Sequence, residues 1–202
     1  MDPTELTRSE QVRCDSCCRN TPGYDIVNYG SIERGYRQLC SRCFNAEVAK
    51  LAGLEQFENV NLDPVIVADC AGEPHEFHFR TRLFGTGVAL DAFELRGGSP
   101  AGYQFQIAGA PGEDLLQLLG QLIKKIRRAL SVKNLIDGEH GLRIADRQIV
   151  QGRIAWDDDQ DGRLPLFIID GREISWDEFG RMLMSFEGSQ FRLTLGDRSE
   201  EL

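Results

Sequence analysis

Two close pairs of cysteines are the residues of this chain whose types and spacing most clearly indicate chemistry. Cys14 and Cys17 form the first pair, and Cys40 and Cys43 form the second, 22 residues further on. A two-residue gap lets both thiolates of a pair face one ion, and two such pairs complete a tetrahedral shell for zinc. Structural zinc closes its shell with four protein ligands, whereas catalytic zinc keeps a position for water. The pattern therefore predicts one structural Zn²⁺ per chain.

The residues around the cysteines predict the elements that would hold the metal. Residues 24–32 are typical of a short hairpin beyond the first pair. After Cys43, apolar residues recur at helical spacing up to Leu51, and Gly53 can end the helix. The second pair would then lie at the helix start, where the positive end of the helix dipole stabilises thiolates.

A first cysteine pair, a hairpin and a second pair leading into a helix resemble a treble-clef zinc finger over about residues 12–53. The resemblance implies that Cys14, Cys17, Cys40 and Cys43 are the ligands. It implies little about function, because such fingers bind proteins, nucleic acids or nothing. Cys18 stands where many of these fingers have glycine, so it could replace Cys17 as a ligand.

Composition limits the classes of protein to which the chain can belong. With 202 residues, 41% of them hydrophobic and 27% charged, it is typical of a soluble globular protein. No apolar run approaches the roughly 18 residues of a membrane helix, and the first residues do not form a signal-peptide pattern. We therefore expect a cytoplasmic protein without a membrane partner. There, the six cysteines would be reduced and available for a metal.

The rest of the chain predicts an α+β fold in which sheets are followed by helices. Four antiparallel strands and an amphipathic helix are expected within residues 59–136. A smaller β-rich unit with one helix is expected in residues 137–202, after a zinc-binding module in residues 1–58. Residues 60–202 also resemble bacterial domains of unknown function.

Several local signals define the last unit. Asp170 and Gly171 are typical of a tight turn between two strands. Ser175 and Glu178 form a capping box at a helix start. The remaining expectations concern three sets of residues: strand positions Leu142, Ile144, Ile149, Ile154 and Trp156; a buried helix face of Trp176, Phe179, Leu183 and Phe186; and a closing strand containing Phe191, Leu193 and Leu195.

Two other groups could ligate metals, and the sequence favours neither. Cys70, His75 and His78 contain suitable side chains, but residues three apart on a strand point to opposite faces. The acidic stretch from Asp157 to Gly162 matches the first half of a calcium loop. The closing position of that loop is Ile168 instead of glutamate, so a solvated turn is favoured.

Charge bears on the choice of partner. The net charge of −9 disfavours general binding to a phosphate backbone. Lys124, Lys125, Arg127, Arg128 and Lys133 nevertheless cluster near the end of the predicted helix, where cations complement the helix dipole.

No phosphate-binding loop, dinucleotide fingerprint or nucleophile elbow is present in the sequence. The favoured interpretation is a non-catalytic zinc protein that binds another protein or itself, or regulates one. A nucleic-acid-binding protein that uses the zinc module and the Lys124–Arg128 face is the first alternative. The second alternative is an enzyme with a pocket near His75 and His78.

Overall fold

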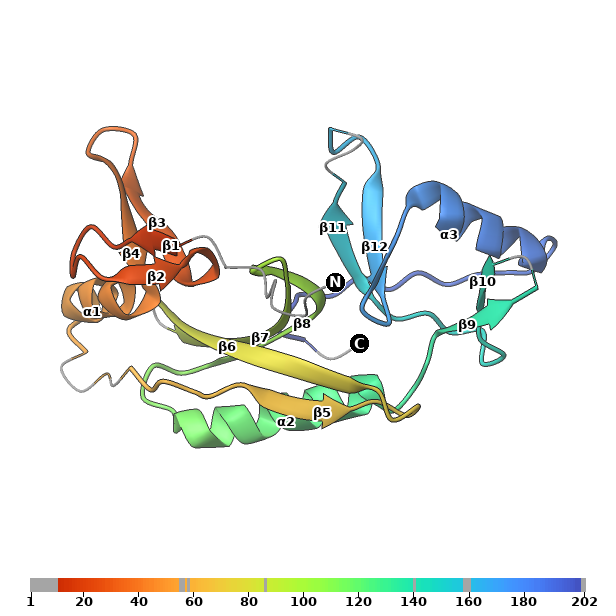
Figure 1. Ribbon diagram of the computed structural model, residues 1–202, viewed down its shortest axis with the longest axis horizontal. Helices are drawn as coiled ribbons and strands as arrows, with labels where there is room; N and C mark the ends of the chain where they lie inside the picture. The colour runs from red at the N-terminus through yellow and green to blue at the C-terminus, as the bar shows by residue number, and fades with distance from the viewer. Residues whose placement is uncertain are drawn as a thin grey trace, which may run out of the picture.

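The computed structural model describes residues 11–54, 57, 59–85, 87–139, 141–157 and 161–200 (Figure 1). Its described part combines three α-helices with antiparallel strands. The predicted α+β class is therefore confirmed. None of the described helices is both long enough and apolar enough to cross a membrane.

The N-terminal part, residues 11–54, contains two hairpins and a helix. Strands β1 and β2 pair with each other, and so do β3 and β4. The αL conformation of Gly53, with a φ of +68°, ends the helix as expected. The predicted hairpin and helix are thus confirmed. The elements are β1 (Gln11–Arg13), β2 (Asn20–Pro22), the 3₁₀ helix η1 (Gly23–Asp25), β3 (Ile26–Ser31), β4 (Gly35–Cys40) and α1 (Ser41–Ala52).

The central part is a four-stranded antiparallel sheet with one helix across a face (Figure 1). All four strands and the helix lie where the sequence predicted them. The helix buries Leu118, Leu122, Ile126 and Leu130 against Phe77 and Leu90 of the sheet. Strand order is β5-β6-β7-β8, for β5 (Val65–Ala68), β6 (Pro74–Phe84), β7 (Gly87–Arg96) and β8 (Ser99–Gly109), and the helix is α2 (Leu115–Leu130).

The C-terminal part has its own core, made by Leu135, Ile144, Ile169, Ile174 and Met182. A two-residue turn joins β12 to β13, and both of its residues, an aspartate and a glycine, have positive φ, as the sequence indicated. The capping box at the start of α3 is also present. The elements are β9 (Leu135–Gly138), β10 (Gly141–Ile144), β11 (Arg153–Trp156), β12 (Pro165–Ile169), β13 (Arg172–Ile174), α3 (Trp176–Leu183) and the 3₁₀ helix η3 (Met184–Phe186).

Three expectations for this C-terminal part are wrong. Residues 190–196 form no strand, although their apolar residues alternate as predicted. Alternation defines a face, but a strand also needs a neighbour for its backbone, and this segment has none in the described chain. In α3 and η3, Phe179 and Phe186 pack against the core as predicted, but the fully buried residue is Met182, and Trp176 and Leu183 are about half exposed. Ile149 is exposed in the loop between β10 and β11.

Candidate metal centre

The four predicted cysteines come together at one point. The Sγ atoms of Cys14, Cys17, Cys40 and Cys43 all lie within 4.8 Å of one another. The Sγ atoms of Cys17 and Cys40 are 3.9 Å apart. A tetrahedral ion with metal–sulfur bonds of about 2.3 Å would place its sulfurs roughly 3.8 Å apart. The cluster can therefore hold a metal ion.

Backbone elements of the N-terminal part position these sulfurs. Cys14 follows β1 directly, and Cys40 is both the last residue of β4 and the N-cap of α1. Two hydrogen bonds tie the first pair to β4: the Asp15 N–H donates to the Gln38 carbonyl at 2.8 Å, and the Gln38 N–H donates to Asp15 Oδ2 at 2.7 Å. Cys43 lies in the first turn of α1, as the sequence indicated.

Cys18 lies outside the cluster of sulfurs. Its backbone has a φ of +59°, in the left-handed region that glycine favours, and its N–H donates to the Cys14 carbonyl. This conformation closes the turn around the first pair and leaves the Cys18 side chain exposed. The geometry thus groups Cys17, and not Cys18, with the other three cysteines.

The pKa values of the cluster favour one thiolate over several. Burial raises the pKa of Cys14, but N–H groups of Cys17, Cys40 and Ser16 outweigh it and lower that pKa from 9.0 to about 6. Burial raises the pKa of Cys40 to about 12 and also raises the pKa of Cys43. One thiolate is therefore favoured, and further negative charges beside it are not. A divalent ion would compensate these charges and displace the protons.

Helix α1, which begins at the cluster, is also attached to the central sheet. Strand β5 pairs with β6 only at Pro74–Phe77, so among the described residues the following half of β6 has no strand on that side. The buried carboxamide of Asn45 occupies this edge. Its Nδ2 donates to the Thr81 carbonyl at 2.9 Å, and its Oδ1 accepts from the Leu83 N–H at 2.8 Å. One side chain thus replaces a neighbouring strand at two backbone groups.

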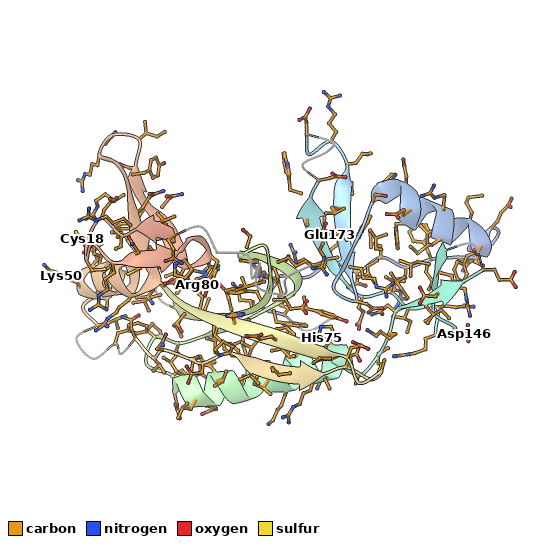
Figure 2. All side chains as sticks on the ribbon, viewed as in Figure 1. Cys18, Lys50, His75, Arg80, Asp146 and Glu173 are labelled. Atoms are coloured by element: carbon orange, nitrogen blue, oxygen red, sulfur yellow. The ribbon has the colours of Figure 1, made fainter. Side chains whose placement is uncertain are left out.

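A second attachment uses the face of the sheet opposite α2. Arg80 donates to the carbonyl of Tyr24, in η1, and to the fully buried carboxylate of Asp91. Arg82 and Gln106 also donate to Asp91. Figure 2 shows Arg80 on the part of β6 that lies next to the N-terminal hairpins. The metal cluster and the central sheet are therefore joined by buried polar contacts.

The sequence indicated neither Asn45 nor Asp91 as an important residue. Asparagine and aspartate are usually exposed, and a single buried one leaves no periodic pattern. The alternation of Arg80 and Arg82 along β6 was the only available signal for the polar face around Asp91.

The second candidate group, Cys70, His75 and His78, is not brought together. His75 and His78 lie on opposite faces of β6, as expected. His75 Nδ1 is 2.8 Å from Glu94 Oε1, and its Nε2 is 3.6 Å from Asp69 Oδ2. Within the part of the chain that the structure describes, the four cysteines are the only group of three or more side chains close enough to share a metal.

Asp69 ties the turn after β5 to the segment that follows α2. Its carboxylate accepts N–H groups of Ala71 and Glu73 and forms an ion pair with Lys133, which follows α2. Lys133 holds the pKa of Asp69 well below its ordinary range, and those N–H groups contribute, although burial opposes the shift. Asp69 is therefore ionised at neutral pH.

The remaining candidate residues have other roles or lie outside the description. Lys125 Nζ donates to the carbonyls of Gln106 and of three residues near the C-terminus, at 2.8–3.3 Å. The predicted basic face is therefore partly used within the chain. Of the acidic stretch, residues 158–160 lie outside the described residues.

A groove of about 500 Å³ lies between the start of β8 and the sheet of β11, β12 and β13. Its lining includes Gln104, Arg153, Trp156 and Glu173, but neither His75 nor His78. The groove thus does not provide the pocket that the enzyme hypothesis placed at the histidines.

Comparison with known protein families gives three matches along the chain. They are a domain of unknown function (DUF7685) over residues 13–55, another (DUF7686) over residues 58–131 and a third (DUF7713) over residues 134–200. None of the three covers half of the chain, and no zinc-finger family is among them. No curated protein and no solved structure matches the chain. The matches give no support for the predicted bacterial origin.

Proposed function

We propose that this chain is a non-catalytic protein-interaction module in which Cys14, Cys17, Cys40 and Cys43 bind one structural zinc ion. An all-cysteine shell leaves no position for a reacting water, which supports a structural role for the metal. Reduced thiolates need a reducing compartment, and this is the reason for proposing a cytoplasmic location. The arrangement would be that of a treble-clef-like finger.

The hairpin of β3 and β4 is the recognition surface in this proposal. It projects from the metal cluster away from the central sheet (Figure 1). Ile32, at its tip, is 92% exposed, and Tyr36 on β4 is 63% exposed. Zinc would fix the base of this hairpin against α1, so that a partner meets Ile32 and Tyr36 on a rigid hairpin. The exposed tip above a closed sulfur cluster is the observation that carries the proposal.

The two alternatives have less support. Lys125 and Lys133 contact groups within the chain, and the net charge is −9, so binding to nucleic acid would rest on few remaining cations. His75 is held between two carboxylates, and the groove includes neither histidine. An enzyme would need a pocket elsewhere.

We also propose that residues 1–58, 59–136 and 137–202 act as three units. The three core clusters lie mainly one in each range, which supports the division, although Ala49 of α1 belongs to the central cluster and Leu135 to the C-terminal one.

Affinity capture from cells with the full chain tests the interaction proposal. Proteins retained by the wild type should be lost with Ile32→Glu, because a carboxylate at the tip opposes burial in an apolar contact. Glu33→Gln, at the neighbouring position, is the control and should retain them. Both variants should contain the same zinc as the wild type. Capture of the same proteins by Ile32→Glu would refute the role of the hairpin, and salt-sensitive capture of nucleic acid would favour the alternative.

A further inference from the structure

The segment that follows η3 has an apolar face that is largely exposed in the described structure. Phe191, Leu193 and Leu195 are 92%, 72% and 68% exposed, and they alternate with polar residues. Within the described chain, no hydrogen bond joins the backbone of residues 190–196 to another segment. An unpaired backbone beside alternating apolar side chains is a template for pairing with a strand.

Strand β11 has the complementary feature. It is the edge strand of its sheet, hydrogen-bonded among the described residues only to β12. Ile154 and Trp156 lie on one face of β11 and are 54% and 66% exposed. Among the residues that the structure describes, this sheet edge therefore has no neighbouring strand and the strand-like segment belongs to no sheet.

Both ends of the segment are attached to other parts of the chain, and within the described residues the segment is not paired with β11. Phe186, just before it, packs against the C-terminal core. Just after it, the carbonyls of residues 198–200 accept hydrogen bonds from Lys125 of α2. Figure 1 shows this stretch running from α3 back towards the central sheet without forming a helix or strand.

The exposed area is that of a stable interface. A wholly buried aromatic side chain contributes roughly 150–250 Å² and a leucine or isoleucine somewhat less, so the exposed fractions of the five apolar side chains offer at most about 700 Å² in each copy. Two copies would together bury up to about 1,400 Å², within the range of about 1,200–2,000 Å² of specific interfaces.

We infer that two copies of this chain associate reciprocally, with residues 190–196 of each copy pairing along the free edge of β11 of the other. The pairing places Phe191, Leu193 and Leu195 beside Ile154 and Trp156 and satisfies backbone groups on both strands. The inference deepens the proposed protein-interaction function and rests on it, but it uses a surface distinct from the β3–β4 hairpin.

Sedimentation of the zinc-loaded full chain at micromolar concentrations tests the inference. The wild type should have twice the mass of the 22.7 kDa chain. Leu193→Lys and Trp156→Lys should each weaken dimerisation by about ten-fold or more, because a charge enters the apolar contact. Thr194→Lys adds the same charge to the opposite face of the segment and should leave the dimer intact.

Mixing the two disruptive variants distinguishes reciprocal pairing from stacking of like surfaces. In a mixed dimer, the intact segment of the Trp156→Lys copy meets the intact β11 of the Leu193→Lys copy. The other contact of the mixed dimer contains both lysines, but one lysine already opens a contact, so the second costs little more. An equimolar mixture should therefore associate more strongly than either variant alone, and this gain also shows that both variants are folded.

A monomeric wild type, a Thr194→Lys variant as weak as Leu193→Lys, or a mixture that associates no more strongly than either variant alone would each overturn the inference. The hairpin experiment separates this failure from that of the proposed function. If Ile32 remains necessary for capture while the chain is monomeric, the interaction function stands and only the self-association is wrong.

Discussion

Replacing Asn45 with alanine tests the attachment between the metal cluster and the central sheet. The carboxamide of Asn45 contacts the Thr81 carbonyl and the Leu83 N–H, and both of these residues are buried. Alanine keeps α1 helical but reaches neither group. Leaving a buried polar backbone group unsatisfied costs about 1–3 kcal/mol, so we expect the loss of about 2–5 kcal/mol of unfolding free energy.

Urea unfolding measures this loss. With a slope of about 2 kcal/mol per molar, the midpoint of the transition should fall by roughly 1–2 M. Asn28→Ala removes an exposed asparagine from β3 and is the matched control, with an expected change below about 0.5 kcal/mol. Zinc content should be unchanged in both variants, because neither side chain belongs to the sulfur cluster.

Amide hydrogen exchange at Leu83 gives the sharper result. In the wild type, this N–H is donated to a buried acceptor and should exchange only when α1 leaves the sheet edge. In Asn45→Ala it should exchange much faster, while amides of β7 paired with β8 change less. Exchange as slow as in the wild type would show that Asn45 does not hold this edge, and the reasoning would be wrong.

Three further outcomes are expected. Cys14→Ser should lose the zinc measured by elemental analysis of purified protein, whereas Cys70→Ser should retain one ion per chain; full zinc in Cys14→Ser would contradict the four-sulfur assignment. Ser175→Ala should lower the unfolding free energy by about 1 kcal/mol through loss of the α3 cap, and an unchanged midpoint would mean that the cap contributes nothing. Lys133→Met should move acid unfolding to higher pH. Because the pKa of Asp69 is lower in the folded than in the unfolded chain, ionised Asp69 stabilises the folded state at pH values above its unfolded pKa. This stabilisation is lost as the pH falls through the folded pKa. Without Lys133 the folded pKa rises, so the loss occurs at higher pH. An acid midpoint that does not move would exclude this role.

Local signals in the sequence were sufficient for most elements. The capping box at Ser175 and the turn at Asp170 and Gly171 depend on residues within a few positions of each other. The sheet and the α2 helix follow from hydrophobic periodicity over one element at a time. The cysteine cluster could be predicted from the sequence for a related reason, because two cysteines separated by two residues can face the same ion.

Pairing between segments far apart in the sequence could not be predicted from such local signals. Alternation at Phe191, Leu193 and Leu195 is the same in a paired strand as in an unpaired segment, so the closing strand was predicted wrongly. Helical spacing on α3 allowed two adjacent faces, and packing selected the one containing Met182. In both cases the deciding contact is with a segment distant in sequence.

The amino-acid sequence by itself determined that two cysteine pairs would face one point, that α1 would begin there and that sheets would be followed by helices. These outcomes depend on bond geometry, capping and periodicity over short spans. Only the tertiary structure decided that Asn45 would complete the edge of β6, that Asp91 would be buried among Arg80, Arg82 and Gln106, and that residues 190–196 would remain unpaired. Each of these outcomes depends on which surfaces pack together in the folded chain. The free energy of that packing comes from many residues that share no pattern in the sequence.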